Sequence, residues 1–352
     1  MQLDFYKGKR VLVTGHTGFK GSWLCRILTL AGARVVGYAL QPPTDPSLFV
    51  LAQIAGEIES IIGDVRDFEK LLGVFERTRP DVVFHLAAQP IVRESYREPR
   101  YTFETNVMGT VNVLECARRT GCVRSMVIVT TDKVYENKEW EWGYREGDTL
   151  CGFDPYSNSK SCAELVTQSY RNAYFADGGT AVSTARAGNV IGGGDFGADR
   201  LVPDCVRAAL RRDAIVLRNP LSVRPFQHVL EPLSAYLLIA HKQYTDFSLA
   251  DSYNVGPAQE DCLTVGEMAE LFCRAWGEGL RYTVHRETNA VHEAGLLRLD
   301  NARICSRLGW APRWDAETAV RKTVEFTKQA MYEQNVSGVL DAQIGAFFSS
   351  EG

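Results

Sequence analysis

Strand-like apolar runs alternate with helix-like segments through the first half of the chain, and this alternation is the feature that most limits its fold. The run RVLVTG at residues 10–15 precedes a helical pattern over about residues 20–31, and similar pairs recur as far as Val190. The longest helical patterns cover residues 101–121 and about 156–176. Parallel strands joined by covering helices produce such repetition. We therefore predict an α/β fold with a Rossmann-type, doubly wound parallel sheet.

The pattern changes beyond Val190, where Gly-rich loops, short strands and separate helices replace the regular pairs. We interpret this part as a smaller C-terminal α/β domain that exchanges segments with the sheet domain. The predicted sheet domain covers residues 1–188 and also includes about 226–256. The smaller domain covers 189–225 and 257–330, and residues 331–352 form a C-terminal tail.

The composition limits the partners and the compartment. The chain has 352 residues, a net charge of −4 and scattered Lys and Arg, so it offers no general attraction to nucleic acid or anionic membranes. Its nine cysteines are widely spaced, with no C-x-x-C pair to suggest a metal site, and are typical of reduced thiols. KGKRVLVTG follows Phe5 almost at once, so we expect no signal peptide, and no apolar run approaches membrane-spanning length. We predict a cytoplasmic protein without a metal.

A glycine-rich turn, VLVTGHTGFKGSWL, lies between the first strand and the first helix. Gly15, Gly18 and Gly21 have no side chains, so backbone N–H groups and the helix N-terminus can approach a pyrophosphate. A glycine trio alone also suits a tight turn, but its place in the first βα unit favours a dinucleotide site.

The end of the second predicted strand bears on the choice of dinucleotide. This strand ends at Ala39 and Leu40 without the acidic residue that usually binds the ribose hydroxyls of NAD, and no arginine follows to hold the 2′-phosphate of NADP. We predict NAD as the cofactor, with His16 and Lys20 as possible substitutes on the adenosine side.

Tyr156 and Lys160 in DPYSNSKSCAE are four residues apart, so on a helix they lie on one face. The ammonium can then lower the pKa of the phenol, which is otherwise a poor base at neutral pH, and can hold the cofactor ribose. Together with the glycine turn and the TTD that follows the preceding strand, this pair predicts proton abstraction from an alcohol.

Motifs along the whole chain resemble those of a known family. TGHTGFKG, HLAAQP, TNVMGT, TTDKVYEN and RAGNVIGGGD, with the Tyr156/Lys160 pair, resemble the extended short-chain dehydrogenase/reductases that modify nucleotide sugars. TTDKVYENKEW, GYREGD, DPYSNSK, DRLVPD and RPFQHVLEPLSAY are similar to the CDP-glucose 4,6-dehydratase family. The similarity covers about Lys9 to Trp314 and departs from the family at Phe226, where a tryptophan is expected. It implies NAD-dependent dehydration of CDP-D-glucose to CDP-4-dehydro-6-deoxy-D-glucose, in dideoxysugar biosynthesis for O-antigen lipopolysaccharide.

The resemblance also implies which residues bind each ligand. NAD, in the sheet domain, would contact Gly15, His16, Thr17, Gly18, Phe19, Lys20, Gly21, Asp64, Val65, Leu86, Ala87, Ala88, Gln89, Asn106, Thr130, Tyr156 and Lys160. CDP-glucose would contact Gln89, Asn189, Leu201, Val202, Arg224 and His292, with His228 and Glu293 as weaker candidates.

By the same resemblance, the catalytic residues are Thr131, Asp132, Lys133, Tyr156 and Lys160. Tyr156 would take the proton of the glucose 4-hydroxyl while NAD takes the C4 hydride. Asp132, kept protonated by a buried site, would be the acid that releases water. Lys133 would be the C5 base if burial and the neighbouring Lys160 leave it neutral, or would instead stabilise the enolate.

Three alternatives share these motifs. A 4,6-dehydratase acting on another NDP-hexose would keep the same site. A nucleotide-sugar 4-epimerase needs no acid to expel a 6-hydroxyl, so Asp132 and Lys133 disfavour it. A non-catalytic NAD-binding regulatory protein would be expected to lose Tyr156, Lys160 or Asp132, although the scaffold would support it. Relatives pair through the helices here at about 99–120 and 155–177, which implies a homodimer or homotetramer.

Overall fold

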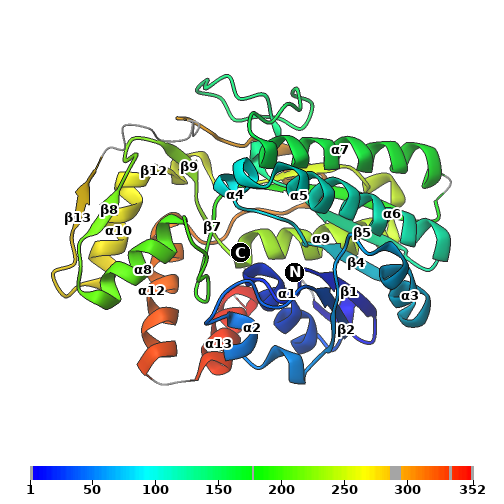
Figure 1. Cartoon of the computed structure of the whole chain (residues 1–352), viewed down its shortest axis with the longest axis horizontal. Coiled ribbons are helices and arrows are strands. Elements are labelled where there is room, and N and C mark those ends of the chain that lie inside the picture. The colour runs from blue at the N-terminus through cyan, green and yellow to red at the C-terminus, as the bar shows by residue number, and fades with distance from the viewer. Residues whose placement is uncertain (1–2, 177, 286–294, 333–334, 350–352) are drawn as a thin grey trace.

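The computed structural model describes residues 3–176, 178–285, 295–332 and 335–349, and its central feature is a parallel sheet (Figure 1). Seven strands are hydrogen-bonded in the order β11-β6-β5-β4-β1-β2-β3. Their bounds are β1 (Arg10–Thr14), β2 (Arg34–Ala39), β3 (Glu59–Ile62), β4 (Val82–His85), β5 (Ser125–Val129), β6 (Ala181–Ala187) and β11 (Ser252–Val255). This order, 3-2-1-4-5-6 with one added edge strand, confirms the predicted Rossmann-type sheet.

Helices cover both faces of the sheet and also build the smaller lobe. They are α1 (Phe19–Leu30), α2 (Leu48–Leu51), α3 (Phe68–Thr78), α4 (Val92–Arg97), α5 (Pro99–Phe103), α6 (Gly109–Thr120), α7 (Pro155–Tyr174), α8 (Leu201–Arg211), α9 (Leu230–Thr245), α10 (Val265–Trp276), α11 (Ala302–Leu308), α12 (Ala316–Tyr332) and α13 (Val336–Ser349). Single turns are η1 (Leu3–Tyr6), η2 (Ile54–Gly56), η3 (Glu104–Met108), η4 (Asp132–Val134), η5 (Phe247–Leu249) and η6 (Gln259–Asp261).

Alternate residues of the strands face two hydrophobic cores. Val11 and Val13 of β1 belong to the core shared with α1 and α9, whereas Leu12 between them belongs to the core shared with α3 and α6. All three side chains are fully buried, and each contributes about 1.5–3 kcal/mol of hydrophobic free energy. A strand buried on both faces therefore reads as an unbroken apolar run, as RVLVT does.

The helix predicted over residues 101–121 is divided by one π-helical turn, η3, between α5 and α6. This turn carries Asn106, whose Oδ1 accepts a hydrogen bond from the backbone N of Gln89 at 2.8 Å. The Asn106 amide also donates to Ser159 Oγ on α7 at 2.9 Å. Such π turns often occur at functional sites, and this one joins the end of β4 to α7.

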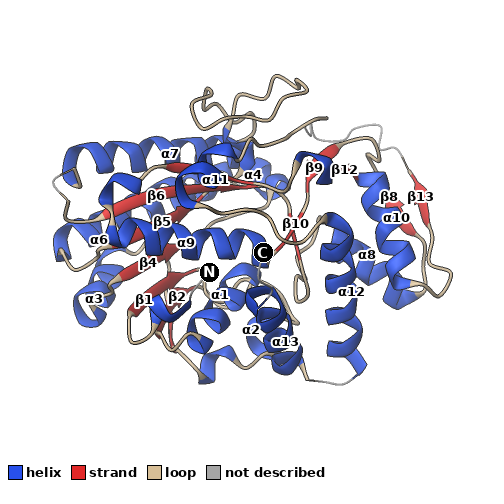
Figure 2. Cartoon of the chain, turned by 180° about the vertical axis from the view of Figure 1, so that it is seen from behind, coloured by secondary structure: helices blue, strands red, loops and turns tan. Residues whose placement is uncertain are grey.

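The smaller lobe stands to one side of the sheet, as Figures 1 and 2 show from opposite directions. It contains α8, α10 and α12, which share a separate core. Its short strands are β7 (Val190–Ile191), β8 (Ile215–Leu217), β9 (Val223–Pro225), β10 (Gln227–His228), β12 (Cys262–Thr264) and β13 (Tyr282–Val284). Between these segments the chain returns to the sheet, because α9 packs beneath it and β11 pairs with β6.

The segment predicted as a C-terminal tail contains a packed helix. Leu340, Ile344 and Phe347 of α13 are buried in the core that includes α1. Arg26 of α1 hydrogen-bonds Asp341 Oδ1 at 2.6 Å. The i, i+4, i+7 spacing of the three apolar residues is that of one helix face, so α13 is part of the sheet domain's core. Among the described residues, none of the helices has the length and apolarity needed to cross a membrane.

Candidate active site

The glycine turn after β1 is tightly packed on one side and open on the other. A Cβ on Gly15, whose φ is +78°, would lie 2.7 Å from the backbone N of Ala87, and a Cβ on Gly21 would lie 2.1 Å from the carbonyl oxygen of Gly15. Gly18 caps α1, and a Cβ there would meet nothing closer than 3.4 Å. The turn therefore presents the N-terminus of α1 without covering side chains, which fits a dinucleotide pyrophosphate.

His16 points into the protein, which corrects the prediction of an adenosine contact. Its ring is fully buried against Gly37 of β2, where a Cβ would come within 2.3 Å of the imidazole. The Nε2 atom is 2.7 Å from Ser60 Oγ on β3. Burial lowers the pKa of His16 to about 4, so the ring is neutral at neutral pH. It packs the turn against β2 and β3.

Lys20 is influenced by charges of the catalytic segment and of the smaller lobe, and its contact with the adenosine side of the cofactor stays a prediction. Burial, and then the charge of Arg200, lower the pKa of Lys20 to about 8, while Asp132 and Asp195 act in the opposite direction. These neighbours belong to the catalytic segment and to the smaller lobe.

The other predicted cofactor residues line the ends of β1, β3 and β4. Thr17 Oγ1 donates to the carbonyl of Leu40 at 2.9 Å, which ties the glycine turn to the end of β2. Asp64 accepts a hydrogen bond from Arg66 at 2.6 Å; burial raises the pKa of Asp64, but the Arg66 contacts outweigh it and leave that pKa low. Val65 is buried beneath Gly109.

The remaining members of this set flank the turn. Phe19 packs against the sheet-domain core, and Leu86, Ala87 and Ala88 directly follow β4.

Three further predicted ligand contacts have side chains that are hydrogen-bonded within the protein. The Gln89 amide donates to Thr102 Oγ1 at 2.9 Å and accepts from the backbone N of Ile91 at 2.6 Å. The Asn106 amide is used as described above, and the Thr130 hydroxyl donates to the carboxylate of Glu164. These hydrogen bonds position the three side chains, and their contacts with ligands stay predictions.

Tyr156 and Lys160 lie one turn apart on α7, which begins at Pro155 and is capped by the Asp154 carboxylate. Burial raises the pKa of Tyr156 to about 12, while a hydrogen bond with Thr131 opposes this. Lys160 Nζ donates to the carbonyl of Val129 at 3.0 Å. Burial, and then the charge of Lys20, lower the Lys160 pKa to about 7. The phenol and the amine thus share one buried site.

Thr131, Asp132 and Lys133 form the turn η4 directly after β5. Thr131 Oγ1 donates to Asp132 Oδ1 at 2.9 Å, and Oδ2 has no hydrogen-bond partner among the described residues. Asp132 is 2% exposed, and burial raises its pKa even though Lys133, Thr131 and Arg224 oppose the shift. Lys133 is only half-buried, and its role as the C5 base stays a prediction.

The predicted sugar-nucleotide residues are more scattered. Asn189 follows β6, and its carbonyl accepts from Gln227 N at 2.9 Å. Arg224 of β9 is 6% exposed, and its charge acts on Asp132. Leu201 and Val202 begin α8, and the Val202 side chain is buried in the core of the smaller lobe. Their contacts with the sugar nucleotide stay predictions.

The last predicted contacts of this set are two histidines and Glu293. His228 is fully buried, and burial lowers its pKa to about 3. His292 and Glu293 lie outside the described residues.

Sequence reasoning missed Asp195 and Arg200. Arg200 Nη1 donates to the nearly buried Asp195 at 3.0 Å, and the Arg200 charge lowers the pKa of both Tyr156 and Lys20. Asp195 ends the motif RAGNVIGGGD, and Arg200 immediately precedes the predicted contact Leu201. Both signals were present, but only the fold brings these residues to the catalytic cluster.

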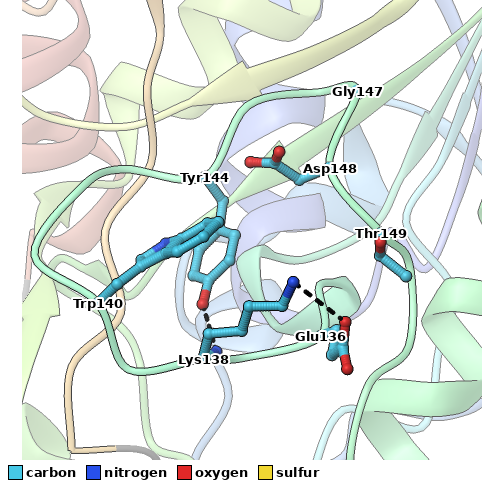
Figure 3. A pocket seen from close by; sticks show the side chains of 7 residues that line it. All are labelled: Glu136, Lys138, Trp140, Tyr144, Gly147, Asp148 and Thr149. Atoms are coloured by element: carbon cyan, nitrogen blue, oxygen red, sulfur yellow. Dashed lines mark hydrogen bonds and ion pairs between the residues drawn. The ribbon is translucent and has the colours of Figure 1, made fainter.

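A loop over residues 136–150 connects the two catalytic segments and encloses a small hollow of about 130 Å³. Figure 3 shows its lining, which is Glu136, Lys138, Trp140, Tyr144, Gly147, Asp148 and Thr149. The Tyr144 ring stacks on Tyr135 with centroids 5.1 Å apart, which fixes the loop beside η4. None of the catalytic residues lines this hollow, and no metal-type cluster of His, Cys, Asp or Glu occurs within the described part of the chain.

Comparisons with known proteins agree with this geometry. The family model described as GDP-mannose 4,6 dehydratase matches residues 12–323. CDP-glucose 4,6-dehydratase of Salmonella typhimurium is 47% identical over 331 residues, which is 92% of either chain.

Two solved structures share the fold. UDP-glucose 4-epimerase of Thermus thermophilus in complex with NAD has a TM-score of 0.79 and 25% identity, covering 91% of this chain and 99% of that one. The dTDP-glucose 4,6-dehydratase of Bacillus anthracis in complex with NAD has a TM-score of 0.76 and 22% identity, covering 93% and 98%.

The parallel sheet, the glycine turn and the Tyr156/Lys160 pair define a dinucleotide-dependent enzyme of the short-chain dehydrogenase/reductase type. More narrowly, the chain belongs to the GDP-mannose 4,6-dehydratase family of NAD-dependent epimerases and dehydratases. The predicted family resemblance is thereby confirmed.

Proposed function

We propose that the protein dehydrates CDP-D-glucose to CDP-4-dehydro-6-deoxy-D-glucose with NAD as its cofactor. The observation that carries the proposal is Asp132, a buried carboxyl that is hydrogen-bonded to Thr131 through one oxygen, while its other oxygen has no partner among the described residues. A 4-epimerase needs no such acid, whereas a dehydratase must protonate a leaving hydroxyl. The 47% identity to the Salmonella typhimurium enzyme supports CDP-glucose as the substrate.

The residues of the site have separate roles in binding NAD and in transferring protons. Bound NAD would accept the hydride from C4 of the glucose and return it to C6. The glycine turn would hold its pyrophosphate at the N-terminus of α1. Tyr156 would accept the proton of the 4-hydroxyl, and the charge of Arg200 lowers the pKa of that phenol. The ammonium of Lys160, one turn along α7, would also stabilise the phenolate.

The 4-keto group makes the C5 proton acidic, so the C5–H bond and the C6–O bond can break in turn. Asp132, whose pKa burial raises, would give its proton to the departing 6-hydroxyl, which leaves as water. Lys133 lies next to it and is the predicted C5 base. Electrostatic stabilisation of the enolate is the alternative role for Lys133.

The substrate is tested by separate incubations of the purified protein with the CDP-, dTDP-, UDP- and GDP-linked hexoses, followed by mass spectrometry. We expect loss of one water from CDP-glucose and slower or no loss from the others. Conversion to a galactose epimer of unchanged mass would overturn the proposal, and water loss from a different nucleotide alone would replace CDP with that base.

We also propose a homodimer or homotetramer formed through α5, α6 and α7. Met108, Leu165 and Tyr174, on or beside these helices, are 50%, 52% and 57% exposed, and such apolar side chains suit an interface. Light scattering after size-exclusion chromatography should show an oligomer that Leu165→Glu weakens. A wild-type monomer would refute this.

The cell compartment and the biosynthetic pathway of the enzyme are also proposed, both from chemical arguments. All nine cysteines are free thiols, which suits the reducing cytoplasm. A keto-deoxysugar nucleotide is an intermediate that later enzymes can modify, so we place the reaction in dideoxysugar biosynthesis for O-antigen lipopolysaccharide. Accumulation of the CDP-sugar substrate in cells without the protein would support this place, and an unchanged pool would contradict it.

A further inference from the structure

Glu164 is a buried carboxylate that no step of the proposed reaction uses. It lies one turn after Lys160 on α7 and is 2% exposed. Its Oε2 atom accepts hydrogen bonds from Thr184 Oγ1 at 2.7 Å and from Arg186 Nη2 at 2.9 Å, both on β6. Its Oε1 atom accepts from the hydroxyl of Thr130. A carboxylate with this many partners is held in one position.

Two consecutive residues at the end of β5 hold two residues of α7. The carbonyl of Val129 accepts from Lys160 Nζ at 3.0 Å, and the side chain of Thr130 donates to Glu164. The catalytic turn that begins with Thr131 follows directly. Glu164 therefore fixes the distance between the strand that supplies Asp132 and the helix that supplies Lys160.

Glu164 also sets the charge around Lys160. The Lys160 ammonium is buried, and Lys20 adds a second positive charge nearby, so both effects favour the neutral amine. Glu164 acts in the opposite direction. A lysine that lost its proton would stabilise the Tyr156 phenolate less, so this negative charge supports the proposed base.

The partner of Glu164 is anchored on its far side. Arg186 Nη1 donates to Tyr135 OH at 2.8 Å and to the carbonyl of Glu146 at 3.1 Å. Tyr135 OH in turn donates to Asn254 Oδ1 at 2.6 Å. Arg186 is thus held by the loop after η4 and, through Tyr135, by β11, so its guanidinium is fixed where it contacts Glu164.

We propose that Glu164 is a positioning residue of the catalytic site, whose carboxylate, paired with Arg186, holds Thr130 and provides a negative charge that favours the ammonium form of Lys160. This inference rests on the proposed function only in that Lys160 serves Tyr156 during turnover. Its alternative is a purely structural tie between α7 and β6. The proposal predicts that removing the Glu164 charge lowers the pKa of Lys160 and that removing the Arg186 charge does not. A purely structural tie predicts no such difference in sign.

The test compares Glu164→Gln, Arg186→Met, the double variant and the control Thr184→Val. Thr184→Val removes one hydrogen bond to Glu164 but no charge. The alkaline limb of the pH profile of kcat/KM with CDP-glucose reports loss of the Lys160 proton. Without the Glu164 charge, Lys160 releases its proton at lower pH, so this limb should fall by about one pH unit or more. In Arg186→Met the pH of the alkaline limb should equal or exceed the wild-type value. In the double variant the limb should lie closer to the wild-type value than in Glu164→Gln.

A second measurement needs no substrate. The pKa of Lys160 can be read from the ¹³C signal of its Cε in lysine-labelled protein, assigned by its loss in Lys160→Met. We expect a lower value in Glu164→Gln and an unchanged value in Thr184→Val. This holds even if CDP-glucose is not turned over, so failure of the proposed function is distinguished from failure of the inference.

Equal shifts in Glu164→Gln and Arg186→Met, or reduced kcat with no shift of the Lys160 pKa, would overturn the inference and leave a structural tie. Thermal unfolding identifies variants that do not fold. If Glu164→Gln does not fold, Arg186→Met still tests the proposal. A Lys160 pKa that is lower in Arg186→Met than in the wild type contradicts it.

Discussion

Thr131 donates a 2.9 Å hydrogen bond to one carboxylate oxygen of Asp132, and the other oxygen of Asp132 has no partner among the described residues. The same threonine also acts on Tyr156, where it opposes the rise of the phenol pKa that burial causes. One threonine therefore acts on both the proposed base for the 4-hydroxyl proton and the proposed acid for the 6-hydroxyl.

Asp132→Asn should separate oxidation from dehydration. The amide keeps the shape of the carboxyl but has no proton to give, so water loss should slow by about 10²–10⁴-fold, while oxidation at C4 continues. Rapid mixing with CDP-glucose should therefore show reduced cofactor accumulating by its absorbance. The exposed Asp213→Asn is the control. Unchanged water loss in Asp132→Asn would remove this residue as the acid.

Lys133→Met should slow exchange of the C5 proton with solvent by about 10²-fold or more if Lys133 is the base. The exchange is measured by NMR of the sugar nucleotide in deuterated buffer. Lys138→Met, on the exposed loop that follows, should have no effect. Normal C5 exchange in Lys133→Met would rule out the base role and leave electrostatic stabilisation of the enolate.

Gly21→Ala should weaken NAD binding and destabilise the fold, because its Cβ would lie 2.1 Å from the Gly15 carbonyl oxygen. Overpacking of this kind costs about 1–3 kcal/mol. Gly73→Ala in α3, where a Cβ meets nothing within 4 Å, is the matched helical control and should be neutral or stabilising. NAD titration and thermal unfolding give both quantities. Equal NAD affinity in wild type and Gly21→Ala would show that the turn relaxes or does not hold the cofactor.

The free energy of unfolding should fall steeply as the pH drops from about 6 toward 4. Burial lowers the pKa of His16 to about 4 and those of His85 and His228 to about 3, from 6.5. Below 6.5 the unfolded chain binds protons that the folded chain excludes, and His16 alone costs about 3 kcal/mol at pH 4. Glu231, whose pKa burial raises to about 7 from 4.5, acts in the opposite direction within that window. So do three other carboxyls whose pKa values burial also raises, Asp132, Glu146 and Asp261.

Urea denaturation across this pH range measures the effect. His16→Gln should flatten the profile, and the exposed His285→Gln should leave it as in the wild type. A profile that is level between pH 6.5 and 4 would contradict the neutral buried histidines.

The sequence predicted the elements that depend on local periodicity. The helix expected at about residues 20–31 is α1, Phe19–Leu30, and the glycine turn precedes it as predicted. Such features follow from apolar spacing and from glycine, which act within one βα unit. The catalytic pair on α7 was found for the same reason, because both residues belong to one helix face.

Contacts between distant segments were not predictable in this way. Whether His16 faces a ligand or packs on Gly37 depends on how β2 lies beside β1, and Asn106 turns toward Gln89 only because η3 adds a π turn. The charges of Asp195 and Arg200 reach the site only after the smaller lobe packs against α1. The residue type was known from the sequence in each case, but the direction of the side chain was set by tertiary packing.

The central claim is that the chain removes water across C5 and C6 of a CDP-linked glucose. The most direct test is incubation with CDP-glucose in deuterated water, followed by NMR and mass analysis of the product. The account predicts a 4-keto-6-deoxy product that has lost one water and carries deuterium at C5. Recovery of CDP-galactose with no loss of water and no deuterium at C5 would contradict it.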